Sequence, residues 1–173
     1  DIRGHAGAIG IRHSGSQGSA LLDSTILAEG AYAGMNNCCG QGGGTYNIEV
    51  IGGRHGIVIE PSSRFPILTG CVFKGQTAAA ITYAKGGSQV PALLVGCLID
   101  SPADAAIDLT TQRAYAGVSM VDCVINLSRG GVIARTKKNE NLYLEDTFVR
   151  GPATVTTDGT ALPVADQWML VRR

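Results

Sequence analysis

The sequence predicts an all-β protein: a right-handed single-stranded parallel β-helix, or solenoid, of about six coils. The first observation is a constant interval of 26 residues between Cys71, Cys97 and Cys123. The second is that apolar residues around these cysteines recur at every second position, as in a strand with one buried face. The third is the abundance of glycine, 24 of 173 residues, which suits a chain that turns often. Repeats of about 20–50 residues built from short strands are typical of solenoids, whose coils bury their apolar sides by stacking.

Each cysteine begins the same local pattern. An apolar pair follows the cysteine, then a turn, and then a second short strand introduced by small residues. The apolar pairs are Val72-Phe73, Leu98-Ile99 and Val124-Ile125, and the second strands are residues 80–83, 106–109 and 131–134. A helix is excluded because the apolar spacing is two rather than three or four, and because glycines interrupt every window.

The repeat extends beyond these three coils in both directions. The further matching segments are residues 8–11, 22–26, 46–50, 144–148 and 153–155. We therefore expect coils over residues 1–158, and a cap or a linker to a further unit over residues 159–173. Because no N-terminal cap is recognisable and an uncapped solenoid exposes unpaired strand edges, we also expect a fragment of a longer β-helix.

Strand alternation assigns side chains to the inner and outer faces. The positions expected to point inward are Val95, Cys97, Ile99, Val121, Cys123, Ile125, Val132 and Ala134. Ile133 is expected to point outward. The acidic residues Asp23, Glu49, Asp122 and Glu145 are expected to form one outward column. Such a column is either a solvated face or a source of the two carboxylates, about 5–10 Å apart, that glycoside hydrolysis uses.

The composition narrows the classes of partner. Fourteen basic and fourteen acidic residues give a formal net charge of zero, so nothing indicates binding to nucleic acid or to an anionic membrane surface. No apolar run approaches the roughly 20 residues that span a bilayer. The chain does not begin with Met, so Asp1 is a processed, excised or arbitrary start.

The cysteines are expected to be structural. A linear ladder of three thiols cannot supply the four tetrahedral ligands that zinc prefers, and parallel Cβ vectors oppose a disulfide between neighbouring strands. We therefore expect Cys71, Cys97 and Cys123 to be buried free thiols that pack as small apolar groups, with no metal and no cofactor. Cys38 and Cys39 are adjacent in a glycine-rich insertion, where a vicinal disulfide is the alternative to two free thiols.

Standard catalytic signatures are absent: the chain has no G-x-S-x-G, no P-loop, no G-x-G-x-x-G and no His pair at metal-ligand spacing. Three polar insertions leave the repeat, at residues 12–18, 38–45 and 60–65. Solenoids usually carry function in such turns. The histidines His5, His13 and His55 lie near turns, where the alternative to a general base is an ordinary surface residue.

The aligned coils resemble the pectate-lyase-like β-helix superfamily, and within it the branch of bacterial pectate lyase superfamily proteins and exo-β-1,3-glucanases. Ala8, Ile9, Gly10, Ile11 and Gln17 match an A-I-G-[IV]-x-x-x-x-x-x-Q pattern, and residues 52–57 match a G-G-x-[YH]-G-[IAM] turn. The resemblance covers roughly residues 1–150. It implies a carbohydrate-active domain that packs against a second β-helix domain or subunit, with a catalytic glutamate on that second domain. The turn that carries glutamines in those glucanases reads Ser62-Ser63-Arg64-Phe65 here, which departs from the family pattern.

We therefore expect a secreted or cell-surface domain that contributes polysaccharide or oligosaccharide binding to a glycosidase or polysaccharide lyase, with an incomplete active site. Glu60 is the candidate catalytic residue, and Gln17, Arg64 and His13 are the candidate substrate-binding residues. A lyase would need an Arg or Lys base near acidic calcium ligands, and Arg54, Arg64 or Lys74 with Glu60 is the set available. The alternative function is a non-catalytic β-helix for structure, adhesion or glycan binding; no motif supports a small-molecule metabolic enzyme.

Overall fold

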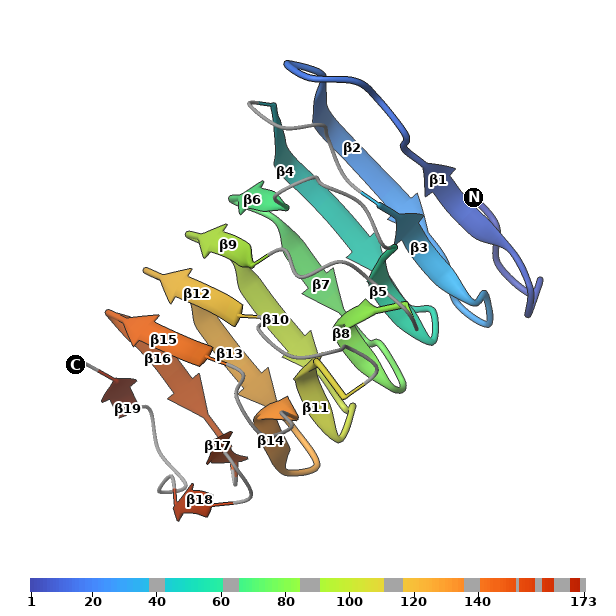
Figure 1. Cartoon of the computed structure of the whole chain (residues 1–173). Coiled ribbons are helices and arrows are strands. Elements are labelled where there is room, and N and C mark those ends of the chain that lie inside the picture. The colour runs from blue at the N-terminus through green and yellow to red at the C-terminus, as the bar shows by residue number, and fades with distance from the viewer. Residues whose placement is uncertain are drawn as a thin grey trace.

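The structure, a computed structural model, describes residues 1–37, 43–60, 66–84, 91–110, 117–135 and 141–151, and the backbone of the strands at 153–157, 160–163 and 169–171. The described residues form strands and turns without a helix. Parallel strands stack into a β-solenoid of about five turns, which confirms the predicted β-helix and comes close to the predicted six coils. The two chain ends lie at opposite ends of the stack (Figure 1).

One sheet, called sheet A, takes one strand from each turn. Its strands, in spatial order, are β1 (Ile9–Arg12), β3 (Ala33–Asn36), β5 (His55–Ile59), β8 (Ala79–Tyr83), β11 (Ala105–Asp108), β14 (Gly131–Arg135), β17 (Ala153–Thr157) and β18 (Thr160–Pro163). All neighbours in sheet A pair in parallel except β17 and β18, which are antiparallel.

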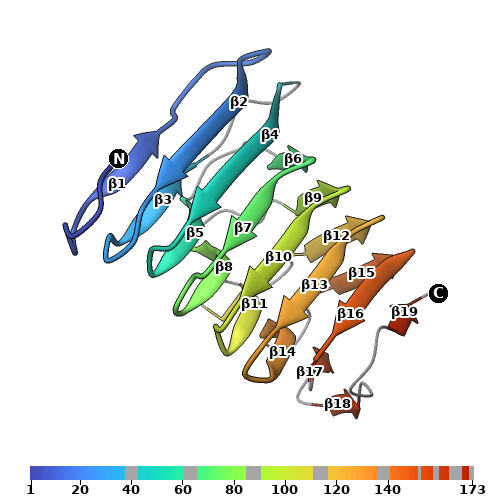
Figure 2. The same ribbon diagram turned by 180° about the vertical axis from the view of Figure 1, so that it is seen from behind.

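The second sheet has two arms that meet at the long strands β2 (Ala20–Leu27) and β4 (Gly44–Ile51). Arm B1 continues through β6 (Ile67–Thr69), β9 (Ala92–Val95), β12 (Gly117–Val121) and β15 (Asn141–Glu145). Arm B2 continues through β7 (Val72–Lys74), β10 (Leu98–Ser101), β13 (Val124–Leu127), β16 (Thr147–Arg150) and the antiparallel β19 (Met169–Val171). Figure 2 shows β4, β7, β10, β13 and β16 side by side.

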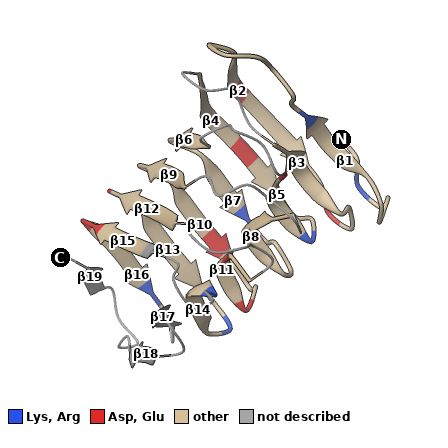
Figure 3. Ribbon diagram, viewed as in Figure 1, with Lys and Arg blue, Asp and Glu red and all other residues tan. Residues whose placement is uncertain are grey.

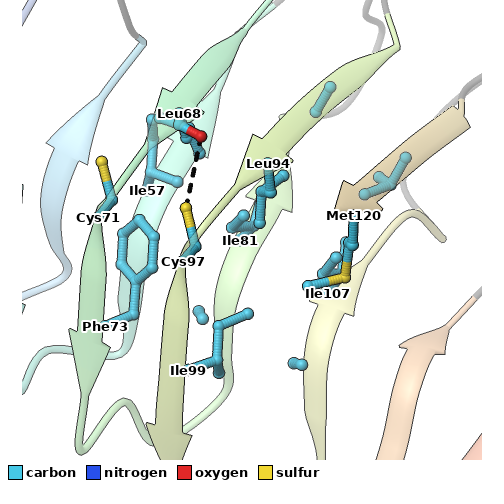
Figure 4. Close-up of a cluster of buried hydrophobic side chains, with 14 of the residues drawn as sticks. Ile57, Leu68, Cys71, Phe73, Ile81, Leu94, Cys97, Ile99, Ile107 and Met120 are labelled. Carbon is cyan, nitrogen blue, oxygen red and sulfur yellow. Dashed lines mark hydrogen bonds between the residues drawn. The ribbon is translucent and has the colours of Figure 1, made fainter. Parts of the chain in front are cut away.

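The cysteine ladder confirms the predicted register. Leu98 pairs with Val72 on one side and with Val124 on the other, so Cys71, Cys97 and Cys123 occupy one column. All three are free and at most 2% exposed. The Cys97 thiol donates to the Leu68 carbonyl of the preceding turn at 3.4 Å (Figure 4). Hydrogen bonds with the neighbouring thiols, together with burial, raise the pKa of Cys97, so this thiol stays protonated and packs as an apolar group.

Replacing Cys97 with serine should therefore lower the free energy of unfolding by about 1–3 kcal/mol, because a hydroxyl replaces a polarisable group in an apolar stack. We expect the lower end of this range. Thr147 occupies the same column, and its buried hydroxyl donates to the Met120 carbonyl at 3.4 Å, so this column can satisfy a hydroxyl. Chemical denaturation measures the loss, with Cys97→Ala as the control that removes sulfur without adding a donor. A non-reducing peptide map that linked two of the three thiols would contradict the assignment.

A column of residues with left-handed backbone conformation separates arm B1 from arm B2. Because of it, part of the predicted inner face is wrong. The members of this column have φ between 44° and 63°: Asp23, Asn47, Gly70, Gly96, Asp122 and Asp146. Aspartate, asparagine and glycine are the residues that adopt this conformation most readily. The residue in left-handed conformation bends the chain, so the alternation of inward and outward side chains begins again on its far side. Val95 and Val121, predicted to point inward, are therefore half-buried and outside the core, while Leu94 and Met120 are fully buried.

The same bend shows that the predicted outward column of carboxylates is wrong. Asp23 and Asp122 lie in the left-handed column, Glu49 pairs with Val72 on arm B2, and Glu145 pairs with Val121 on arm B1. These side chains therefore belong to three different columns. Within the left-handed column, the Asn47 amide donates to the Asp23 carboxylate at 2.8 Å, so the two turns are joined there by a hydrogen bond.

Sheet A contains a second break in alternation, where two successive residues face the core. Ala106 and Ile107 are both fully buried in the core cluster, and so are Ile133 and Ala134 in the next strand. The prediction that Ile133 points outward is therefore wrong, as is the inward position predicted for Val132, which is half-buried and outside the core. In β5 the first of the two positions is Gly56, where a Cβ atom would collide with the ring of Phe73.

Candidate functional site

The outer face of sheet A is hollowed. Val58 and Thr82 lie outside the core cluster, yet they are only 4% and 6% exposed. A cavity of about 390 Å³ lies over this face, and we call it the sheet A hollow; it is lined by Tyr32, Arg54, His55, Val58, Thr82, Tyr83, Ala84 and Asp108. These residues come from four successive turns of the solenoid, so the hollow follows the solenoid axis.

A second hollow of about 620 Å³ shares Tyr32 and Arg54 with the first, and therefore adjoins it. It lies over the turns that lead from β2, β4 and β7 into sheet A, and its other lining residues include Glu29, Gly52 and Thr77. Gly52 has a φ of 78°, and a Cβ atom there would lie 2.7 Å from the Glu29 backbone. The close stacking of these turns thus requires glycine. Because glycine has no side chain, the space over these turns stays open.

Backbone hydrogen bonds between turns position Tyr32 and Arg54 at the junction of the two hollows. The Tyr32 N–H donates to the Ala8 carbonyl at 3.1 Å, and the Arg54 N–H donates to the Ala31 carbonyl at 2.9 Å. The buried Gln76 side chain donates to the Gly52 carbonyl at 3.0 Å, which holds the turn that carries Arg54. Both side chains therefore extend from turns whose backbone is hydrogen-bonded to neighbouring parts of the stack.

His55 is the titratable group at the centre of the sheet A hollow. Its ring packs edge-on against Tyr32, with ring centroids 5.5 Å apart and an interplanar angle of 74°. Burial lowers the pKa of His55 below its ordinary value of 6.5, and Arg54 lowers it further, while Asp108 and the backbone of Ala79 act in the opposite direction. The imidazole is therefore neutral at pH 7. Its Nδ1 atom is buried and has no hydrogen-bond partner in the described part of the chain.

Asp108 and Arg135 form the acidic and basic end of the same face. The Thr110 hydroxyl and backbone N–H donate to Asp108 Oδ1 at 2.6 Å and 2.9 Å, which fixes the carboxylate. Arg135 lies 3.7 Å from Asp108 Oδ2 and 3.5 Å from Asp104 Oδ2. Arg54, in contrast, forms no ion pair with any described residue. The hollow thus offers one guanidinium without a carboxylate partner, one fixed carboxylate and one neutral imidazole.

The structure brings two of the sequence-predicted residues to one corner, beside the ends of β1, β3 and β5. Glu60 Oε1 lies 3.4 Å from Arg12, and the Asn37 amide donates to Oε2 at 3.5 Å. The His13 N–H donates to the Asn36 carbonyl of the next turn at 3.0 Å, and His13 lies two turns away from Glu60 along the solenoid axis. Glu60 is thus held by a cation and an amide.

Gln17 and Arg64 complete the predicted set. Gln17 is exposed in the turn before β2, and Arg64 lies outside the described residues, as do Cys38 and Cys39. The roles predicted for Glu60, Gln17, Arg64 and His13 stay predictions. Of the set weighed for a lyase, Lys74 is separated from the others, because it pairs with Glu49 at 2.9 Å on arm B2.

Sequence reasoning considered Arg54 and His55 separately but missed the other residues of the sheet A hollow. Thr82 and Asp108 share the outer face of sheet A, but nothing in the sequence showed that this face is concave. The signal that could have found them is the column they occupy. Among the six sheet A strands from β1 to β14, it carries Val58 in β5 and polar residues in the other five: Arg12, Asn36, Thr82, Asp108 and Arg135.

Within the described ranges no three His, Cys, Asp or Glu side chains gather closely enough to hold a metal ion. The same residues contain no helix long and apolar enough to cross a membrane. Comparisons with protein-family models, with curated proteins and with solved structures each found no match for the chain. The fold and the site together define a parallel β-helix with a polar hollow on one of its outer sheet faces.

Proposed function

We propose that the chain is a carbohydrate-active β-helix domain that binds an oligosaccharide or polysaccharide in the sheet A hollow. The observation that carries the proposal is the set of groups in that hollow: the Tyr32 ring, the neutral His55, the fixed Asp108 and Arg54, which forms no ion pair with any described residue. Sugar rings present apolar C–H faces and many hydroxyls, so a sugar site combines an aromatic ring with donors and acceptors in fixed positions. The resemblance to the pectate-lyase-like superfamily supports the same substrate class.

The direction of the hollow favours a linear polymer. Successive strands of a sheet lie about 4.8 Å apart, so the four turns that line the hollow span about 15 Å along the axis. The adjoining hollow at Glu29 and Thr77 extends the surface sideways at the corner. A chain of sugars lying along sheet A would contact Asp108 near one end and Tyr32 near the other. A secreted or cell-surface location accords with such a substrate.

We further propose that this chain alone does not cleave the polymer. Glycoside hydrolysis needs a proton donor and either a nucleophile or a positioned water on opposite sides of the sugar. The two candidate carboxylates each have a cationic partner: Glu60 lies beside Arg12, and Asp108 lies beside Arg135. In these positions their oxygens are available to accept hydrogen bonds from sugar hydroxyls. The family resemblance implies that the proton donor lies on a second β-helix domain or subunit.

Titration of the purified chain with β-1,3-glucan, pectate and alginate oligosaccharides, followed by NMR or calorimetry, tests the binding. We expect one of these ligands to bind and His55→Ala to weaken its affinity about tenfold, which corresponds to roughly 1.4 kcal/mol, or one hydrogen bond and a ring contact. Lys74→Ala is the matched control, because it removes a polar side chain from arm B2, away from the hollow. Equal binding by both variants would place the sugar elsewhere, and binding of none of the ligands would favour the structural alternative.

The same preparations test for cleavage when reducing ends and unsaturated products are followed over time. We expect no turnover above the background reaction. Robust turnover that Glu60→Gln abolished would overturn the incomplete-site argument and make the chain a self-sufficient enzyme.

A further inference from the structure

The outer face of arm B1 is an apolar strip that crosses the solenoid from one end to the other. Strand pairing places its outward residues in two columns, which run Ala20, Gly44, Ile67, Leu93, Ser119, Tyr143 and Leu22, Tyr46, Thr69, Val95, Val121, Glu145. Glu145 is the one charged residue among these positions, and the Tyr143 hydroxyl donates to it at 2.8 Å. Four of the large apolar residues are well exposed: Leu22 at 52%, Tyr46 at 39%, Leu93 at 37% and Tyr143 at 39%.

The other two outer faces differ in character. Arm B2 carries the Lys74–Glu49 ion pair, and the Asn126 amide there donates to Asp100 at 2.9 Å. Sheet A carries Arg12, Asp108 and Arg135. In Figure 3 the strands β6 and β9 of arm B1 show no charged residue along their length. An all-parallel sheet with an apolar outer face is usually covered, and no described segment of the chain covers arm B1.

We propose that the arm B1 strip is the contact surface between two copies of this chain. From the exposed fractions, the strip offers about 500 Å² of accessible surface per copy, near the upper end for a monomer's largest apolar patch. Two such strips would bury about 1,000 Å² in total, close to the smallest area at which specific interfaces form. The dimer is therefore weak, with a dissociation constant in the micromolar range.

The chemistry of the strip favours a second copy over a glycan or a charged partner. Sugar hydroxyls facing Leu93, Val95 and Val121 would lose water without gaining hydrogen bonds. A charged protein surface would lose hydration in the same way. A surface of the same composition has neither cost, and two flat sheet faces pack about 10 Å apart with their side chains interleaved.

The position of Glu145 determines how the two copies face each other. If the two solenoid axes ran in the same direction, β15 would lie over β15 and the two Glu145 carboxylates would approach each other. With the axes in opposite directions, β15 of one copy lies over β2 of the other. The two carboxylates are then about 24 Å apart, since five strand spacings of about 4.8 Å separate β2 from β15. The dimer is therefore antiparallel, with β6 and β9 nearest its two-fold axis.

Sedimentation velocity of the whole chain between about 1 and 500 μM tests the proposal across the expected dissociation constant. We expect the wild type to shift from monomer to dimer over this range. Leu93→Lys, which places two like charges near the two-fold axis, should weaken the dimer about tenfold or more. Leu98→Lys is the matched control, because Leu98 is a half-buried outward leucine in the same turn, on arm B2, and its variant should dimerise as the wild type does.

A charge-pairing experiment distinguishes a second copy from any other cover. Leu93→Lys and Leu93→Glu should each dimerise about tenfold more weakly than the wild type when alone, and should form a tighter mixed dimer when combined, because opposite charges then meet at the axis. Far-UV circular dichroism and thermal melting establish that both variants are folded. A wild type that stays monomeric up to 500 μM would overturn the proposal. So would a dimer that Leu98→Lys disrupts and Leu93→Lys does not, or a failure of the two charged variants to pair.

Discussion

Replacing Phe73 with alanine should lower the free energy of unfolding by about 3–5 kcal/mol, the usual cost of deleting a buried aromatic ring. Phe73 is fully buried and lies in one column with Val50 and Ile99 of the neighbouring turns. Gly56, on the facing strand of sheet A, has no side chain that could move into the space the ring leaves. The cavity would thus stay largely open. Because each turn of a solenoid is stabilised by its neighbours, a defect here weakens the stack on both sides.

Urea or guanidinium denaturation followed by circular dichroism measures this loss. Phe148→Ala is the matched control, since Phe148 lies on the same arm B2 but points outward and is 40% exposed. Its removal should change stability by about 0.5 kcal/mol or less, as is usual for surface substitutions. Equal losses for the two variants would show that the ring of Phe73 does not fill the core as the structure places it.

Adding a single methyl group at Gly56 should also destabilise the fold strongly, by about 1–3 kcal/mol. A Cβ atom at this position would overlap the Phe73 ring and would lie 2.6 Å from the Ala80 carbonyl oxygen. The ring could shift, but the carbonyl belongs to the backbone of the next sheet A strand and cannot move without disturbing the ladder. Gly56→Ala therefore strains both the core and the strand pairing between β5 and β8.

Two comparisons make this second prediction specific. Gly96→Asn should be nearly neutral, because Gly96 has a φ of 61°, nothing lies within 4 Å of its added Cβ, and Asn47 occupies the same column. Combining Gly56→Ala with Phe73→Leu should cost less than the sum of the two single changes, because a smaller side chain relieves part of the overlap. Additive losses in that double variant would show that the two residues are not in contact.

The fold was predictable because stacked parallel strands place residues of the same column in the same environment, either in the core or at the surface. A residue that faces the core in one turn lies one strand spacing from its equivalent in the next, so apolar residues recur at a fixed interval. Cys71, Cys97 and Cys123 reveal that interval, and the strand pairings reproduce it. Their state as buried free thiols followed from the same geometry.

The errors arose where the backbone leaves the regular strand conformation. Gly96 and Asp122 adopt left-handed angles, which restart alternation and place Val95 and Val121 on the outer face. The extra inward residue in sheet A moved Ile133 into the core in the same way. A prediction that assumes strict alternation of inward and outward residues cannot detect where the alternation shifts by one residue. Apolar residues occur at both kinds of position, so the shift leaves no clear trace in the sequence.

The candidate site was the least predictable part. Glu60 was chosen because its turn leaves the repeat, and the structure places it beside Arg12 and Asn37. The sheet A hollow instead combines Tyr32, His55 and Asp108 from separate turns. No two of these are near neighbours in the chain, and none forms a motif with its sequence neighbours.

The sequence by itself therefore determined the class of fold, the stacking register and most of the core, since all three depend on a pattern that repeats along the chain. Only the tertiary structure decided which outward residues are buried, which carboxylates hold a cation and which face is mostly apolar. The physical reason is that burial outside the core depends on how neighbouring turns curve around a side chain. That curvature is set by bends such as the one at Gly96, whose glycine is compatible with many conformations until the stack selects one.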